Sequence, residues 1–230
     1  MILSPARILR QTALRYADEI ALVNYERNRR WTYRELHRLT NRACNMLTDR
    51  FRLGEGDKVA TLLQNDHMGL LFTMSMKTDC TNLWLGIMDS LKEHLYQLDY
   101  VKPSLIFIEK DLLDQYYEPL TQRNIAIVSM DEPDEARPGV HHFWDLAAES
   151  SPEDPGAQFV ADDANEHIWL LKFTGGTTGR GKCFISLARN ESPSILGISR
   201  SSVMTSGRSS TILSLAIYGS MAVPTISMSS

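Results

Sequence analysis

The hydrophobic positions of this chain alternate between a helical period and short unbroken runs over residues 1–130. Thr32–Glu35 has the hydroxyl and glutamate spacing of a capping box, and apolar residues recur behind it on one helical face as far as Arg52. Ser90–Glu93 repeats this arrangement, and Pro103 ends the helical stretch that follows. The pattern therefore predicts two helices, each of which begins at its own cap and buries one face.

Short apolar runs separate the helical stretches and are typical of buried strands. Such runs occupy residues 59–63, 82–85, 104–108, 125–128 and 167–173, and further helices are expected at 65–77 and 111–120. Because the runs show little polar alternation, both faces of the sheet they form should be covered. The sequence therefore predicts an α/β fold with a mostly parallel sheet and helices on both of its faces.

The first residues are predicted to form an amphipathic helix whose arginines face water. Its apolar stripe consists of Ile8, Leu9, Ala13 and Leu14. A transit peptide is the alternative, because three arginines precede the first acid, Asp18, but no apolar signal core accompanies them. Farther on, residues 130–166 are acidic and carry four prolines, which favours a surface excursion with one short helix at 144–148.

The composition changes near residue 190. From Glu191 onward the only other charged residues are Arg200 and Arg208, and serine fills 13 of the last 40 positions. A stretch with so few charges and no steady apolar period should pack poorly on the domain or form loose helix. A transmembrane helix at 211–228 would be short and interrupted by serines, so none is expected. We divide the chain into a domain of residues 1–190 and a serine-rich, divergent or truncated tail of residues 191–230.

The bulk properties are those of an ordinary globular protein with a net charge of -4. This balance gives no global basic field that would attract nucleic acid. The three cysteines are widely scattered and fit a reducing, cytoplasmic compartment. His141 and His142 are adjacent but have no cysteine or carboxylate partner pattern, so no metal site is predicted.

The segment Thr174–Lys182 carries the chemistry. It follows a predicted strand and combines four glycines with three threonines and a terminal lysine. Glycines allow the backbone to approach a ligand, and successive N–H groups in such a turn form an anion-binding nest. Hydroxyl donors and one mobile cation complete what a nucleotide triphosphate requires. A flexible surface loop is the plain alternative.

A P-loop is the second alternative for this segment. Gly176–Lys182 satisfies the first seven positions of that motif, but Cys183 occupies the eighth, where a hydroxyl should hold magnesium. A P-loop must also open a helix, whereas residues 183–187 are predicted to form a strand.

The segment also resembles the phosphate-binding signature of AMP-forming acyl-CoA synthetases and related adenylating enzymes. The residues in step with that signature are Thr174, Gly175, Gly176, Thr177, Thr178, Gly179, Arg180 and Lys182. Upstream, Trp31–Leu36, Leu53–Val59 and Leu63–Asn65 are similar to three further motifs of the family in the expected order. The resemblance covers residues 5 to about 190, and the glycine at position 175 is similar to a variant of fatty-acyl-CoA synthetases.

The resemblance implies a two-step reaction and a set of ligands. A carboxylate attacks the α-phosphate of ATP bound with Mg²⁺, and the thiol of coenzyme A then displaces AMP. It implies that Thr174, Gly175, Gly176, Thr177, Thr178, Gly179 and Lys182 hold the β- and γ-phosphates, while no residue can be named as catalytic. The substrate implied is a carboxylic acid, in particular a fatty acid.

Departures from the family pattern put activity in doubt. Gly181 replaces a proline and should loosen the loop, Cys183 replaces a glycine, and Ser186–Asn190 lacks an expected histidine. The later motifs for adenine, ribose, the hinge and the catalytic lysine are absent from these 230 residues. The chain is therefore expected to be an incomplete adenylating domain, inactive alone. The alternative is a non-catalytic remnant or interaction module, which could self-associate through its unfinished surface.

Overall fold

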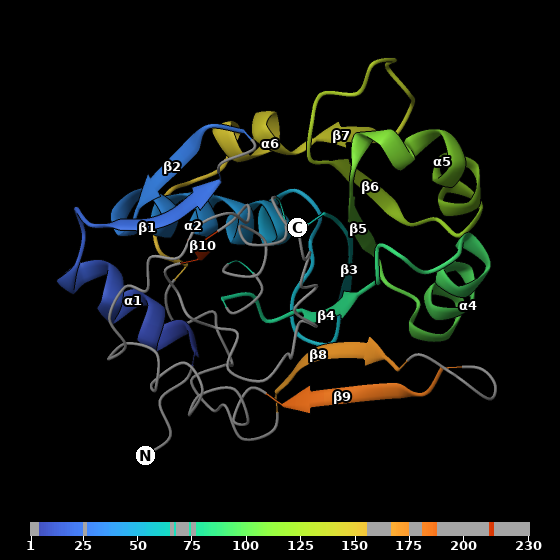
Figure 1. Ribbon diagram of the computed structural model, residues 1–230, viewed down its shortest axis with the longest axis horizontal. Coiled ribbons are helices and arrows are strands. Elements are labelled where there is room, and N and C mark those ends of the chain that lie inside the picture. Colours follow the sequence, from blue (N-terminus) through green and yellow to red (C-terminus); the bar gives the residue numbers. More distant parts are fainter. Residues whose placement is uncertain are drawn as a thin grey trace, which may run out of the picture.

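A computed structural model describes residues 5–24, 27–64, 67, 74, 77–155, 167–174, 181–187 and 212–213. At its centre lies a seven-stranded sheet with the order β7-β6-β5-β3-β4-β8-β9 (Figure 1). The strands are β3 (Lys58–Leu62), β4 (Thr81–Trp84), β5 (Leu105–Ile108), β6 (Ala126–Ser129), β7 (Val140–His142), β8 (Ile168–Phe173) and β9 (Cys183–Leu187). All neighbouring strands run parallel except β8 and β9, which pair antiparallel.

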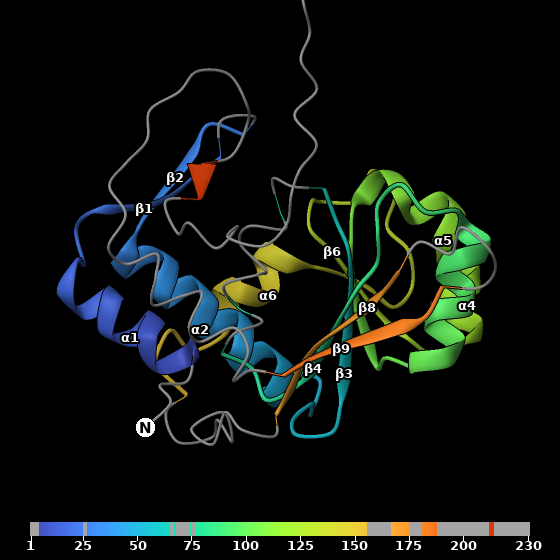
Figure 2. The same cartoon turned by 60° about the horizontal axis from the view of Figure 1, so that its bottom comes forward.

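Helices cover both faces of this sheet, as the sequence predicts. They are α1 (Pro5–Arg15), α2 (Tyr33–Asp49), α4 (Leu91–Val101), α5 (Leu113–Gln122), which follows a 3-10 turn at Lys110–Leu112, and α6 (Phe143–Glu149). Figure 2 shows α2 and α6 on one side of the sheet and α4 and α5 on the other. Each side has its own buried cluster, one built around α2 and α6 and the other around α4 and α5.

Local hydrogen bonds fix where α2 and α4 begin. The Thr32 hydroxyl accepts from the Glu35 backbone N–H at 3.2 Å, and the Glu35 carboxylate accepts from the Thr32 backbone N–H at 2.8 Å. Ser90 and Glu93 form the same reciprocal pair at the start of α4. At the other end of α4, Lys102 adopts a left-handed conformation with φ 54° directly before Pro103. Both predicted capping boxes are therefore confirmed.

The central strands are apolar because both of their faces are covered. In β5, all four residues are fully enclosed, and β3 on one side and β6 on the other pair with it in parallel. Successive residues of β5 alternate between the two clusters: Leu105 and Phe107 join α2, whereas Ile106 and Ile108 join α4 and α5. Three predicted strands are thus confirmed as parallel neighbours.

The prediction of a surface excursion at residues 130–166 is wrong for its middle part. Residues 140–142 form strand β7, which pairs with β6 and extends the sheet. The short helix α6 was predicted, but it buries Phe143 and Leu146 in the core instead of lying on the surface. Phe143 packs edge-on against Phe107 of β5 at 6.0 Å between ring centroids. Two apolar residues on so short a helix give little sequence signal.

A second, smaller sheet was not predicted. Its strands β1 (Ile20–Asn24) and β2 (Arg29–Thr32) form an antiparallel pair next to α2, and β10 (Ile212–Leu213) pairs with β1. Apart from residues 212–213, the predicted tail lies outside the described residues. So does the predicted helix at 65–77, except for His67, Met74 and Lys77.

The apolar stripe of α1 differs from the prediction at one position. Leu9 and Ala13 are buried, and Ala6 joins them, but Leu14 is 76% exposed. The Ile8 side chain lies outside the described residues. None of the helices in the described part of the chain is long and apolar enough to cross a membrane.

Candidate functional site

The glycine-rich segment joins β8 to β9 at the edge of the sheet where the parallel strands end (Figure 1). Its two ends close on each other. The Thr174 backbone N–H donates to the Lys182 carbonyl at 3.0 Å, and the Lys182 N–H donates to the Thr174 hydroxyl at 3.3 Å. Both residues are solvent-exposed. The other five predicted site residues, Gly175, Gly176, Thr177, Thr178 and Gly179, lie outside the described residues.

Gly181 is needed at the base of this hairpin because two backbones meet there. A Cβ atom at this position would lie 2.5 Å from the Thr174 carbonyl oxygen, closer than real contacts allow. The structure thus gives Gly181 a steric role that the sequence did not indicate. The glycine is the residue that permits the close approach between the two ends of the hairpin.

The P-loop alternative is contradicted by the element that follows the loop. Residues Cys183–Leu187 form strand β9, paired antiparallel with β8, and no helix begins there. A P-loop needs a helix N-terminus behind its phosphates. Cys183 also places a thiol where a P-loop would offer a hydroxyl to magnesium, and burial raises the pKa of that thiol.

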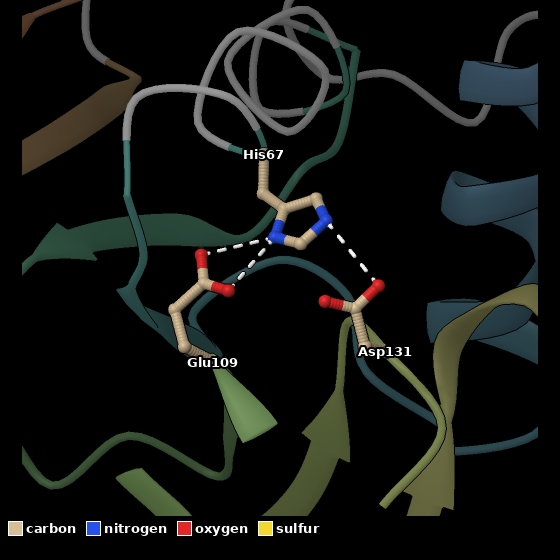
Figure 3. Close-up of side chains that lie close together, drawn as sticks. All are labelled: His67, Glu109 and Asp131. Carbon is tan, nitrogen blue, oxygen red and sulfur yellow. Dashed lines mark hydrogen bonds and ion pairs between the residues drawn. The ribbon is translucent and has the colours of Figure 1, made fainter. Parts of the chain in front are cut away.

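A second group of polar residues lies at the same end of the sheet, near the carboxyl ends of the parallel strands. It consists of His67, Glu109 and Asp131, hereafter the edge cluster, and Figure 3 shows the imidazole between the two carboxyl groups. His67 Nδ1 lies 2.9 Å and 3.0 Å from the two Glu109 oxygens. Its Nε2 lies 3.8 Å from an oxygen of Asp131. In the part of the chain that the structure describes, this is the one group of three side chains arranged to share a metal ion.

Backbone and side-chain donors hold the edge cluster in place. The Gln64 backbone N–H donates to Glu109 at 2.8 Å, and Arg27 donates to Asp131 at 2.7 Å. His67 and Glu109 are almost fully enclosed, with 2% and 5% of their side chains exposed, whereas Asp131 is 20% exposed.

Sequence reasoning missed the edge cluster because its members are 42 and 22 residues apart along the chain. The signal was nevertheless present. Glu109 directly follows the apolar strand β5, and Asp131 comes two residues after β6. Polar residues at the ends of adjacent parallel strands meet at one edge of the sheet.

A buried lysine anchors the region after β3 to α2. The Lys77 side chain is among the most deeply buried in the described chain, and its amine donates to Thr40 at 2.8 Å and to Asn41. Burial lowers the Lys77 pKa to about 8. These hydrogen bonds explain how a lysine is tolerated inside the core.

His141 and His142 are the adjacent histidines that end β7. His142 lies 3.0 Å from Asp145 in the first turn of α6, and His141 packs edge-on against Phe51. Both side chains are therefore held by local contacts.

The family described as AMP-binding enzyme matches residues 9–218. No curated protein matches the sequence significantly.

Many solved structures share the fold. An anthranilate CoA ligase, AuaEII, in complex with anthranoyl-AMP has 19% identity and a TM-score of 0.72, covering 86% of this chain and 36% of its own. A natural red-emitting luciferase from Phrixothrix hirtus has 18% identity and a TM-score of 0.68, covering 86% and 50%. A fatty acyl CoA synthetase from Mycobacterium tuberculosis has 16% identity and a TM-score of 0.62, covering 80% and 34%. The present chain thus spans a third to a half of these structures.

Proposed function

We propose, from the premise that this chain belongs to the AMP-binding enzyme family, that it carries the phosphate-binding part of an ATP-dependent carboxylic acid–CoA ligase. The observation that carries this proposal is the hairpin between β8 and β9, with Thr174 and Lys182 at its mouth. Two of the similar structures are an anthranilate CoA ligase and a fatty acyl CoA synthetase, which agrees with this proposal.

The described part of the hairpin fits a nucleotide phosphate. Gly181 keeps the base of the loop narrow, and Lys182 is exposed beside it, so its amine can reach an anion. We assign the β- and γ-phosphates of ATP to Thr174, Gly175, Gly176, Thr177, Thr178, Gly179 and Lys182. Threonine hydroxyls and backbone N–H groups would donate to phosphate oxygens, and Lys182 would offset their charge.

The remaining ligands follow from the same assignment. Mg²⁺, when bound with ATP, would neutralise charge that develops on the phosphates during adenylation. Coenzyme A is the second substrate, and the acid is a fatty acid, as Gly175 in the signature suggests. Scattered cysteines agree with a cytoplasmic location.

We further propose that these 230 residues do not complete adenylation alone, that residues 1–190 form the N-terminal part of the adenylation domain, and that residues 191–230 are a serine-rich, divergent or truncated tail. No motif for adenine, ribose or the catalytic lysine occurs in the sequence. A loop that contacts only the phosphates should discriminate poorly among nucleotides, and added salt should weaken nucleotide binding.

A non-catalytic interaction module is the second candidate. The observation that favours it is the edge strand β9, where Phe184 is 57% exposed and Ile185 is 51% exposed. An exposed apolar edge strand invites pairing with another chain. Sedimentation of the chain over a range of concentrations tests this candidate, which predicts a rise in mass that Phe184→Lys abolishes.

The test of the ligase proposal separates phosphate binding from chemistry. We expect the chain to bind ATP and pyrophosphate weakly, with loss in Lys182→Ala and no change in Lys92→Ala, a matched exposed lysine on α4. ATP–pyrophosphate exchange with fatty and aromatic acids should remain at background. Binding that is equal in both variants would contradict the assignment of the loop. Exchange that depends on the acid and on Lys182 would contradict the proposal that the chain is inactive alone.

A further inference from the structure

The edge cluster lies where the chain reverses its direction across the sheet. Between β3 and β4, the described residues Met74 and Cys80 lie on the face covered by α2, since they belong to the same core cluster as Leu36. After β5 the chain passes over the opposite face, where Leu113 and Tyr116 of α5 are buried. Because β3 and β5 are neighbours, their connections separate at the carboxyl ends of the two strands. Such a switch point in an open α/β sheet is where ligands bind.

An open hollow of about 750 Å³ occupies this position. Five carboxylates and only two cations line it, and its lining includes Glu109, Asp131 and Arg27. The hollow therefore favours a cationic ligand over the phosphates that the distant hairpin is built to hold.

The orientation of His67 is that of a metal-binding imidazole. A carboxylate oxygen can only accept, so Nδ1–H of His67 is the donor to Glu109 at 2.9 Å and 3.0 Å. Nε2 then points at Asp131, and the 3.8 Å between them is too long for a hydrogen bond. It does suit two ligands that each lie about 2.0–2.2 Å from one ion. Histidines that bind metals commonly donate their other ring N–H to a carboxylate in this way.

We propose that the edge cluster is a site for a divalent transition-metal ion. His67 Nε2 and the Asp131 carboxylate are its protein ligands, and Glu109 is a positioning residue that fixes the tautomer and direction of the imidazole. The mixed nitrogen and oxygen set favours ions such as Zn²⁺, Co²⁺ or Mn²⁺ over Ca²⁺. Of the three cluster residues, Glu109 and Asp131 line the hollow, and His67 lies behind them. The site is separate from the phosphate-binding hairpin, which lies beyond β4 at β8 and β9.

The experiment titrates the full chain with Co²⁺ and follows its visible spectrum, with Zn²⁺ competition and calorimetry for the stoichiometry. We expect one ion per chain, with no thiolate band in the near ultraviolet. Asp131→Asn and His67→Gln each remove a ligand and should weaken Co²⁺ binding by about tenfold or more. Glu109→Gln should also lower the affinity, by about 10–100-fold, which is the range known for residues that orient a metal ligand. Asp134→Asn is the matched control, because Asp134 lines the same hollow and pairs with Lys110 as Asp131 pairs with Arg27, but it does not belong to the edge cluster.

Three results would overturn the proposal: the absence of saturable binding, a thiolate band that assigns the ion to a cysteine, or equal losses in Asp131→Asn and Asp134→Asn. The last would show diffuse attraction to an acidic surface. If His67→Gln fails to fold, the more exposed Asp131→Asn still decides the question, with its near-ultraviolet circular dichroism as the check on folding.

Discussion

The amine of Lys77 lies 3.0 Å from Nδ1 of His37, on the inner side of α2. Burial and the charge of Lys77 lower the pKa of His37 to about 4, while Asp154 on the other side of the ring opposes this change. Arg10, which binds Asp154 through two hydrogen bonds of 2.6 Å and 2.9 Å, lowers the His37 pKa further. The pair therefore links the stability of the N-terminal helices to pH.

The free energy of unfolding should fall as the pH is lowered through this region. His37 binds a proton near pH 6.5 when unfolded but only near pH 4 when folded. Between these values the unfolded chain binds more protons, so stability is full above pH 6.5 and is lost toward pH 4. One such proton gives a slope of up to about 1.4 kcal/mol per pH unit. Urea unfolding at a series of pH values measures it, and the slope should be shallower in His37→Gln. Equal slopes would contradict this role of His37.

Replacing Lys77 should move the His37 pKa upward. The charge of Lys77 is the second cause of the lowered value, after burial, and Lys77→Met removes that charge while keeping most of the side-chain volume. NMR titration of the His37 ring measures the shift, with the exposed Lys92→Met as the control. The variant should also unfold at lower urea concentration, because Thr40 and Asn41 lose their donor. An unchanged His37 pKa would show that burial alone sets it.

A methyl group at Gly181 should open the base of the phosphate-binding hairpin. Gly181→Ala places a Cβ 2.5 Å from the Thr174 carbonyl oxygen, so the backbones must separate. The cost expected for such crowding is about 1–3 kcal/mol. Urea unfolding and hydrogen exchange of the Thr174 N–H would detect it. Gly54→Ala is the matched control, since nothing lies within 4 Å of its added Cβ. If both variants behave alike, the close approach at Gly181 is not a constraint in solution.

The cap of α2 should make a measurable contribution to stability. Thr32→Ala removes the hydroxyl that accepts from the Glu35 N–H, and loss of such a cap costs about 1 kcal/mol. Thr32→Ser keeps the hydroxyl and should restore most of the stability. Chemical unfolding of the three proteins provides the comparison, and an alanine variant as stable as the serine variant would refute the contribution.

The sequence by itself determined the elements that are fixed by near neighbours. The boxes at Thr32 and Ser90 each join residues three positions apart, so the starts of α2 and α4 could be predicted without knowledge of the fold. The apolar run of β5 likewise indicated a strand enclosed on both faces. Glycines, threonines and Lys182 after β8 identified the candidate phosphate-binding segment, because the chemistry lies in one continuous stretch.

Only the tertiary structure decided which distant side chains meet. Glu109 and His67 are 42 residues apart and come together because β5 lies beside β3, an order that no local pattern states. Phe143 is buried because β7 extends the sheet beside β6 and brings α6 against the core. Gly181 reads as a flexible residue in the sequence and becomes a constrained one only where the backbone of Thr174 approaches it. Hydrogen bonds over three residues are encoded locally, whereas contacts across the sheet depend on how the whole chain buries its apolar surface.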